Sequence, residues 1–175
     1  ETANPSAIRR NVSFCEAVYQ GEQTVEDMTC HLAESVEQAQ QFLAEGKLTV
    51  LVDPAGESIR EWKPLAVVDG ILAKKNLGTS RDMAPITVAL GPGFVAGQDV
   101  DAVIETKRGH NLGRVLWNGS AAPNTGIPGI IGGYGKGRAS SAQSRALRYA
   151  GLFGGQEQIF KRALRRAHDR HHALN

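Results

Sequence analysis

Residues 105–111 bring together an acid, a hydroxyl, two bases, an imidazole and an amide. Glu105 and His110 carry the kinds of side chain that proton transfer requires, and Arg108 can hold a phosphate through two parallel hydrogen bonds. We therefore predict Glu105 and His110 as candidate catalytic residues, and Arg108 and Asn111 as candidate ligand-binding residues. The alternative is an exposed hairpin that carries charge only to remain soluble.

Two aspartates each come directly after a short apolar segment. Asp53 follows residues 48–52, and Asp69 follows residues 65–68. If these segments are parallel strands, both carboxylates lie at the carboxyl edge of a sheet, where open α/β sheets bind ligands such as ribose hydroxyls or a metal ion. The alternative is that each aspartate caps the helix that follows it. The spacing of cysteines and histidines predicts no metal site.

A basic stretch and a glycine-rich turn follow Asp69 along the chain. Lys74 and Asn76 suit a phosphate or a carboxylate, unless they belong to a solvated turn. Gly91 and Gly93, in a Gly-Pro-Gly triplet, let the backbone pass close to a ligand and can present amide donors to an anion. A tight turn without a ligand is the simpler account of this triplet.

The apolar pattern predicts the elements that position these residues. Residues 48–52, 65–68 and 86–90 are short, nearly continuous apolar runs, typical of strands buried in a parallel sheet. Strands that alternate with helices indicate an α/β fold with right-handed crossovers. We expect a partial Rossmann-like arrangement of three layers, in which the three strands lie side by side and their carboxyl ends share one edge.

Further elements are expected around this sheet. Apolar spacing predicts a helix over residues 5–20, and a Ser-x-x-Gln capping box predicts a second helix that starts after Ser35 and ends near Gly46. Residues 102–106 and 114–117 predict a β-hairpin.

The composition is that of an ordinary globular chain. Of 175 residues, 41% are hydrophobic and 22% are charged, which disfavours whole-chain disorder, collagen and coiled coil. The longest apolar runs are too short for a membrane span. Two cysteines are too few for a disulfide scaffold, so we expect a cytoplasmic protein. Residues 118–137 are rich in glycine and lack a secondary-structure period, which predicts functional or disordered loops.

Charge divides the chain into two parts. Residues 1–137 hold 16 acidic and 12 basic residues, whereas residues 138–175 hold two acidic and eight basic ones. We predict an α/β domain over residues 1–137 and a basic helical appendage over residues 138–175. The appendage has the character to dock on nucleic acid, on a membrane surface, on an acidic partner or on its own domain. An aromatic content of 6% argues against nucleic acid.

A series of spaced motifs resembles one protein family. In order, the motifs are PxxIR (5–9), VDP (52–54), VDxxLAKxNLGT (68–79), DMAP (82–85), LGPGFxAG (90–97), VIETxRGHxLG (103–113) and NTGxPG (124–129). Over about residues 1–135 the chain resembles the YqeB-type accessory proteins of selenium-dependent molybdenum hydroxylases. The number of spaced matches makes the resemblance specific.

The resemblance implies a cytoplasmic protein that helps to mature or supply the cofactor of a molybdenum hydroxylase, with that hydroxylase or its maturation machinery as partner. Members of the family normally begin with a glycine-rich strand-turn-helix of dinucleotide-binding type, which this sequence does not contain. They usually continue after residue 137 into a small β-rich module, where residues 138–175 here have a helical and basic pattern.

Our leading hypothesis is a non-catalytic accessory protein that binds an anionic ligand, a nucleotide or a molybdopterin-type phosphate, at the sheet edge and associates with copies of itself. The first alternative is an enzyme acting on a nucleotide or pterin, with Glu105 or His110 as acid or base. The second is a protein that binds nucleic acid or an acidic partner through its basic C-terminal helix.

Overall fold

A computed structural model of the protein describes residues 1–7 and 9–125. The basic helix expected over residues 138–175 lies outside the described residues, as does most of the glycine-rich segment that ends at residue 137. The described residues all belong to the predicted α/β domain. Within the described ranges, no helix has the length and apolar character needed to cross a membrane.

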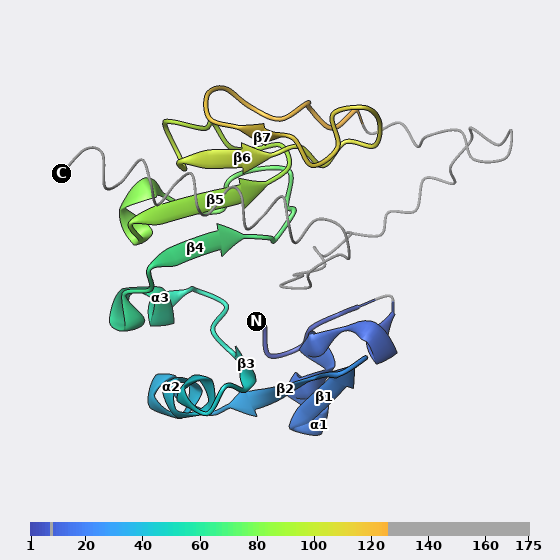
Figure 1. The fold of residues 1–175 in the computed structure, drawn as a ribbon, viewed down its shortest axis with the longest axis vertical. Coiled ribbons are helices and arrows are strands. Elements are labelled where there is room, and N and C mark those ends of the chain that lie inside the picture. The colour runs from blue at the N-terminus through green and yellow to red at the C-terminus, as the bar shows by residue number, and fades with distance from the viewer. Residues whose placement is uncertain (8, 126–175) are drawn as a thin grey trace, which may run out of the picture.

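The first part of the chain forms a three-stranded sheet, called sheet A here. Its strands are β1 (Glu22–Val25), β2 (Met28–Ala33) and β3 (Leu48–Leu51), hydrogen-bonded in that order (Figure 1). The pair β1 and β2 is antiparallel, and β2 and β3 are parallel. The helix α2 (Val36–Ala44) connects β2 to β3 and packs against both strands, which makes a βαβ unit.

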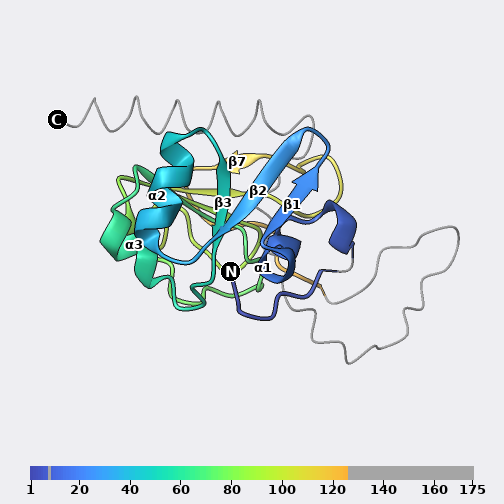
Figure 2. The ribbon, with the colours of Figure 1, turned by 90° about the horizontal axis from the view of Figure 1, so that it is seen from below.

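The second part forms a four-stranded sheet, called sheet B. Its strands, in spatial order, are β4 (Ala66–Asp69), β5 (Ile86–Leu90), β6 (Ala102–Ile104) and β7 (Val115–Leu116). The first three strands are parallel, and their arrows point the same way in Figure 1, whereas β7 is antiparallel to β6. Two short helical elements precede strands of this sheet along the chain. The helix α3 (Glu57–Trp62) precedes β4, and the 3-10 helix η3 (Arg81–Met83) precedes β5. Seen from below, α2 and α3 lie next to each other (Figure 2).

The chain is thus a mixed α/β protein with two sheets, each containing parallel and antiparallel pairs. The expectation that residues 48–52, 65–68 and 86–90 share one sheet is wrong, because β3 lies in sheet A while β4 and β5 lie in sheet B. The strand β3 does not join sheet B because it pairs with β2 and with Glu1. It pairs with β2 through the α2 crossover. Its end is also covered by Glu1, whose amino group donates to the Leu51 carbonyl at 2.6 Å and whose carbonyl accepts from the Asp53 N–H at 2.9 Å.

The single helix expected over residues 5–20 is also wrong. Ser13 has an extended backbone (φ −133°, ψ 121°), which breaks the helix. Val12 and Tyr19, two of the residues whose spacing predicted the helix, are 44% and 43% exposed. The segment instead contains two 3-10 turns and one short helix, η1 (Arg10–Val12), η2 (Phe14–Glu16) and α1 (Ala17–Gln20). The strand β1, which follows Gly21, had no counterpart among the expected elements.

The capping box and the hairpin are confirmed. The Ser35 hydroxyl accepts a hydrogen bond from the Gln38 N–H at 3.2 Å, as a capping box requires, whereas the Gln38 side chain accepts one from the N–H of Glu34, the residue before the N-cap, at 2.7 Å. Gly46 takes a positive φ of +75° just after α2, as a helix-ending glycine does. The expected hairpin is the antiparallel pair of β6 and β7.

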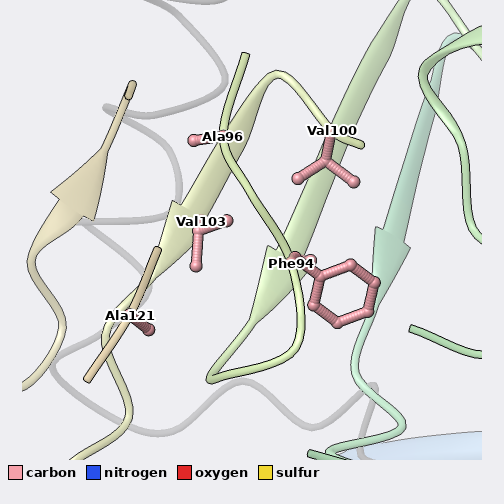
Figure 3. Packing of buried hydrophobic residues seen from close by; sticks show 6 residues of the cluster. Phe94, Ala96, Val100, Val103 and Ala121 are labelled. Atoms are coloured by element: carbon pink, nitrogen blue, oxygen red, sulfur yellow. The ribbon is translucent and has the colours of Figure 1, made fainter. Parts of the chain in front are cut away.

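Most of the buried hydrophobic residues among those described, and both clusters that they form, lie on sheet B or on the segments that follow its strands. Four consecutive residues of β5, residues 86–89, are buried, which confirms the strand expected to be covered on both faces. On one face the segment after β5 folds back, so that Phe94 and Val100 pack against Val103 of β6 (Figure 3). The loops at the end of β5 are therefore anchored to the sheet by apolar contacts.

Candidate functional site

Three loops meet at the carboxyl edge of sheet B. They follow the adjacent parallel strands β4, β5 and β6, so they leave the sheet at the same edge. A Cβ atom added at Gly91, after β5, would lie 2.7 Å from Oγ1 of Thr106, after β6, and 3.5 Å from a methyl carbon of Leu72, after β4. We call loops 70–79, 91–93 and 106–114 together the carboxyl-edge site.

Gly93 makes a second contact between these loops. Its φ is +111°, and an added Cβ atom would lie 2.5 to 2.8 Å from backbone atoms of Lys75. The space that Gly91 and Gly93 leave open is therefore occupied by the protein itself. These two predicted ligand-binding glycines hold loops together, so the simpler account, a tight turn, describes their contacts.

Asp69 lies at this edge, as predicted, and is only 6% exposed. One carboxylate oxygen accepts from the Ile71 N–H at 2.9 Å, and the other accepts from the Thr79 hydroxyl at 2.6 Å. The carboxylate thus ties both ends of loop 70–79 together. Both oxygens of Asp69 are thus bound by groups of the protein, and the residue stabilises the shape of loop 70–79.

The Asn76 side chain stabilises the same loop through hydrogen bonds to its backbone. Its Oδ1 accepts from the N–H groups of Gly78 and Thr79, both at 2.8 Å, and its Nδ2 donates to the Thr79 carbonyl at 2.8 Å. The predicted ligand-binding Asn76 therefore has an internal role. Lys74, by contrast, is exposed.

Glu105 is buried at the end of β6, with 6% exposure. Its two carboxylate oxygens accept from the N–H groups of Lys107 and Ala122, each at 2.7 Å. Burial alone would raise the pKa of Glu105, but hydrogen bonds from the N–H groups of Ala122, Lys107 and Thr106 outweigh burial and hold that pKa below its ordinary value. A base with both oxygens engaged and a lowered pKa is poorly suited to proton abstraction near neutral pH.

The other predicted residues of this hairpin lie on its outer side. Arg108, His110 and Asn111 are exposed, on a turn closed by a hydrogen bond from the Gly113 N–H to the Glu105 carbonyl at 2.8 Å. The structure brings them to the carboxyl edge. Within the described residues it shows no hydrogen bond that draws their side chains toward one point.

The exposed charge of the site is positive. Five exposed basic side chains stand on its loops or at the start of β7: Lys74, Lys75, Lys107, Arg108 and Arg114. No acidic residue occurs in residues 70–80 or 106–114, and the two acids beneath, Asp69 and Glu105, are buried. Arg114, Thr79 and Thr106 were outside the predicted set. The hairpin pattern could have indicated Arg114, because the start of an antiparallel partner lies beside the end of β6.

Asp53 does not belong to the carboxyl-edge site, since it follows β3 of sheet A. One oxygen accepts from the N–H groups of Gly56 and Glu57 at 2.9 and 3.1 Å, and the other accepts from the N–H and hydroxyl of Ser58 at 2.8 and 2.5 Å. The capping alternative thus describes Asp53. Its pKa is lowered, because the hydrogen bonds from Ser58, Glu57 and Gly56 outweigh the raising effect of burial.

We expect Asp53→Ala to lower the free energy of unfolding by about 1 kcal/mol, the usual effect of losing a helix cap. Because the folded-state pKa is depressed, this contribution is present at neutral pH and is lost as the pH falls through that pKa. Urea unfolding at pH 7 and at pH 3 measures both effects. Glu61→Ala removes an exposed acid from the same helix and serves as control; equal losses in the two variants would contradict the capping role.

Other reactive groups offer no second site in the described part of the chain. No three His, Cys, Asp or Glu side chains there come together as a metal ion would require. Burial raises the pKa of the Cys30 thiol to about 11, which leaves little thiolate at neutral pH.

Fold and site together define a mixed α/β protein with a basic loop edge on a largely parallel sheet. Over 134 residues, 77% of its length, the chain is 54% identical to the uncharacterized protein YqeB of Escherichia coli (strain K12). The chain spans 25% of the length of that protein. The resemblance to YqeB-type proteins expected from the motifs is therefore confirmed for this part. No family model matches the chain, and no solved structure does.

Proposed function

We propose that the carboxyl-edge site binds an anionic, phosphorylated small molecule, such as a nucleotide or a pterin phosphate. The observation that carries this proposal is the set of exposed basic side chains on loops that follow adjacent parallel strands. They stand out from their surroundings, because residues 1–137 as a whole hold more acidic than basic residues. A local positive charge on an acidic body concentrates anions at one edge.

We also propose that sheet B is a partial Rossmann-like sheet, which its adjacent parallel strands support. In such folds, ligands bind beyond the carboxyl ends of parallel strands, and here β4, β5 and β6 supply three adjacent ends. A ligand there would contact Lys74 and Arg108 from two different loops. Charge-assisted hydrogen bonds from lysine and arginine are the usual means of holding phosphate.

The wider role that we propose is maturation of a selenium-dependent molybdenum hydroxylase by a cytoplasmic accessory protein that works with that hydroxylase or its machinery and with copies of itself. This role rests on the family resemblance, whereas the geometry bears on the ligand. Between an accessory protein and an enzyme, the engaged carboxylate of Glu105 favours the accessory protein.

We expect Lys74→Ala combined with Lys75→Ala to raise the Kd for ADP, pyrophosphate or a pterin phosphate about 100-fold or more, since each charge-assisted contact contributes on the order of 1.5–3 kcal/mol. Isothermal titration calorimetry at two salt concentrations measures the change. The control, Arg9→Ala combined with Arg60→Ala, removes the same charge from exposed positions elsewhere. Absence of binding by the folded parent protein, or equal weakening in both double variants, would contradict the proposal.

A further inference from the structure

Loop 70–79 contains backbone strain that no turn or helix end explains. Leu72 and Lys74 have positive φ angles of 56° and 63°, and Ala73 between them does not. Two other described residues that are not glycine share this feature. Glu26 stands in the tight turn between β1 and β2, and Lys63 ends α3. A leucine with positive φ is uncommon, and such strain persists only where the surrounding structure imposes it.

The surrounding structure does impose it. The carboxylate of Asp69 and the amide of Asn76 fix the two sides of the loop through Ile71 and Thr79. The backbone of Lys75 rests on Gly93, where a Cβ atom would lie 2.5 Å away. Contacts within the protein therefore hold the loop in its strained shape.

The strained stretch also leaves its backbone donors unused. Within the described residues, the N–H groups of residues 72–77 donate to no acceptor. The N–H groups on either side, of Ile71 and of Gly78, are engaged by Asp69 and Asn76. A run of free donors thus lies between two fixed ends.

Alternating signs of φ have a known consequence for such donors. Successive N–H groups in alternating left- and right-handed conformations turn toward a common concavity, which binds anions. The side chains of Lys74 and Lys75 extend from this stretch and add two positive charges.

We propose that the backbone N–H groups of residues 72–77 form a cradle for a phosphate group of the ligand, with Lys74 and Lys75 closing over it. This inference rests on the proposed function and assigns the phosphate subsite to one loop. A site made only of exposed side chains on the hairpin would leave these N–H groups unchanged on binding.

Nuclear magnetic resonance of the 15N-labelled, 175-residue chain, titrated with inorganic pyrophosphate, tests this assignment. We expect the N–H resonances of residues 72–77 to shift downfield together and with the Kd measured by calorimetry. If calorimetry shows binding but the shifts are confined to residues 106–114, the cradle is wrong and the proposed function stands. If pyrophosphate, ADP and a pterin phosphate all fail to bind, the proposed function falls, and the cradle with it.

A pair of substitutions at one position gives a second test. Leu72→Gly and Leu72→Val both remove the leucine side chain, but glycine accepts a positive φ and valine resists it. We expect Leu72→Val to bind pyrophosphate about tenfold more weakly than Leu72→Gly does. Thermal unfolding checks that both variants are folded. Equal affinities would overturn the cradle, and the resonance shifts of the parent remain decisive if Leu72→Val does not fold.

Discussion

Replacing Gly93 with alanine is expected to lower the free energy of unfolding by about 3 kcal/mol or more, the combined effect of backbone strain and overpacking. An alanine must adopt a φ of +111°, and its Cβ atom would lie 2.5 Å from Cα and 2.6 Å from N of Lys75. Because these neighbours are backbone atoms, relief requires that loop 70–79 move away from the turn after β5. We therefore expect ligand binding at the carboxyl-edge site to be lost with the stability.

Gly78→Ala is the matched control for this prediction. Gly78 has a similar φ of +121°, but nothing lies within 4 Å of an added Cβ atom. The variant therefore measures the backbone strain alone, about 1 kcal/mol or slightly more. Urea unfolding of both variants gives the difference. Equal destabilisation would mean that the contact between Gly93 and Lys75 contributes nothing to the fold.

The strands of sheet B could be predicted from local pattern, whereas the partner of β3 could not. The nearly continuous apolar run at residues 86–89, interrupted by Thr87, predicted burial on both faces, and the structure agrees. The run at residues 48–52 looks the same but pairs with β2 in the other sheet. Which strand a segment joins depends on contacts between distant residues, such as the pairing of Glu1 with Leu51 and Asp53. Composition and periodicity carry no record of those contacts.

The sequence predicted where the candidate residues lie better than it predicted the roles of their side chains. Asp69, Lys74 and Arg108 lie on loops at one sheet edge, because parallel order alone decides which strand ends meet there. The roles of the acids depend on their partners. Glu105 was expected to act in proton transfer, but its second oxygen is bound by the N–H of Ala122, seventeen residues along the chain. A sequence motif shows that a carboxylate is present, but it does not show which N–H groups bind that carboxylate in the folded protein.

Glu105→Gln is expected to lower the free energy of unfolding by about 2 to 3 kcal/mol, the range for hydrogen bonds to a buried charged group. Glutamine has one acceptor oxygen, so its NH2 group must face the N–H of either Lys107 or Ala122, and both were bound by the carboxylate at 2.7 Å. Chemical unfolding at pH 7 measures the loss. Glu61→Gln, at an exposed position in α3, is the control and should change stability little.

The pH dependence of the same variant separates a structural Glu105 from a catalytic one. The pKa of Glu105 is lowered in the folded protein, because its backbone hydrogen bonds outweigh burial. The stability that the carboxylate adds is therefore present at neutral pH and is lost as the pH falls through that lowered pKa. The parent and Glu105→Gln should differ most near pH 7 and converge in acid. A catalytic base would give the opposite result, a variant as stable as the parent that has lost turnover of a nucleotide or pterin, and that outcome would restore the enzyme hypothesis.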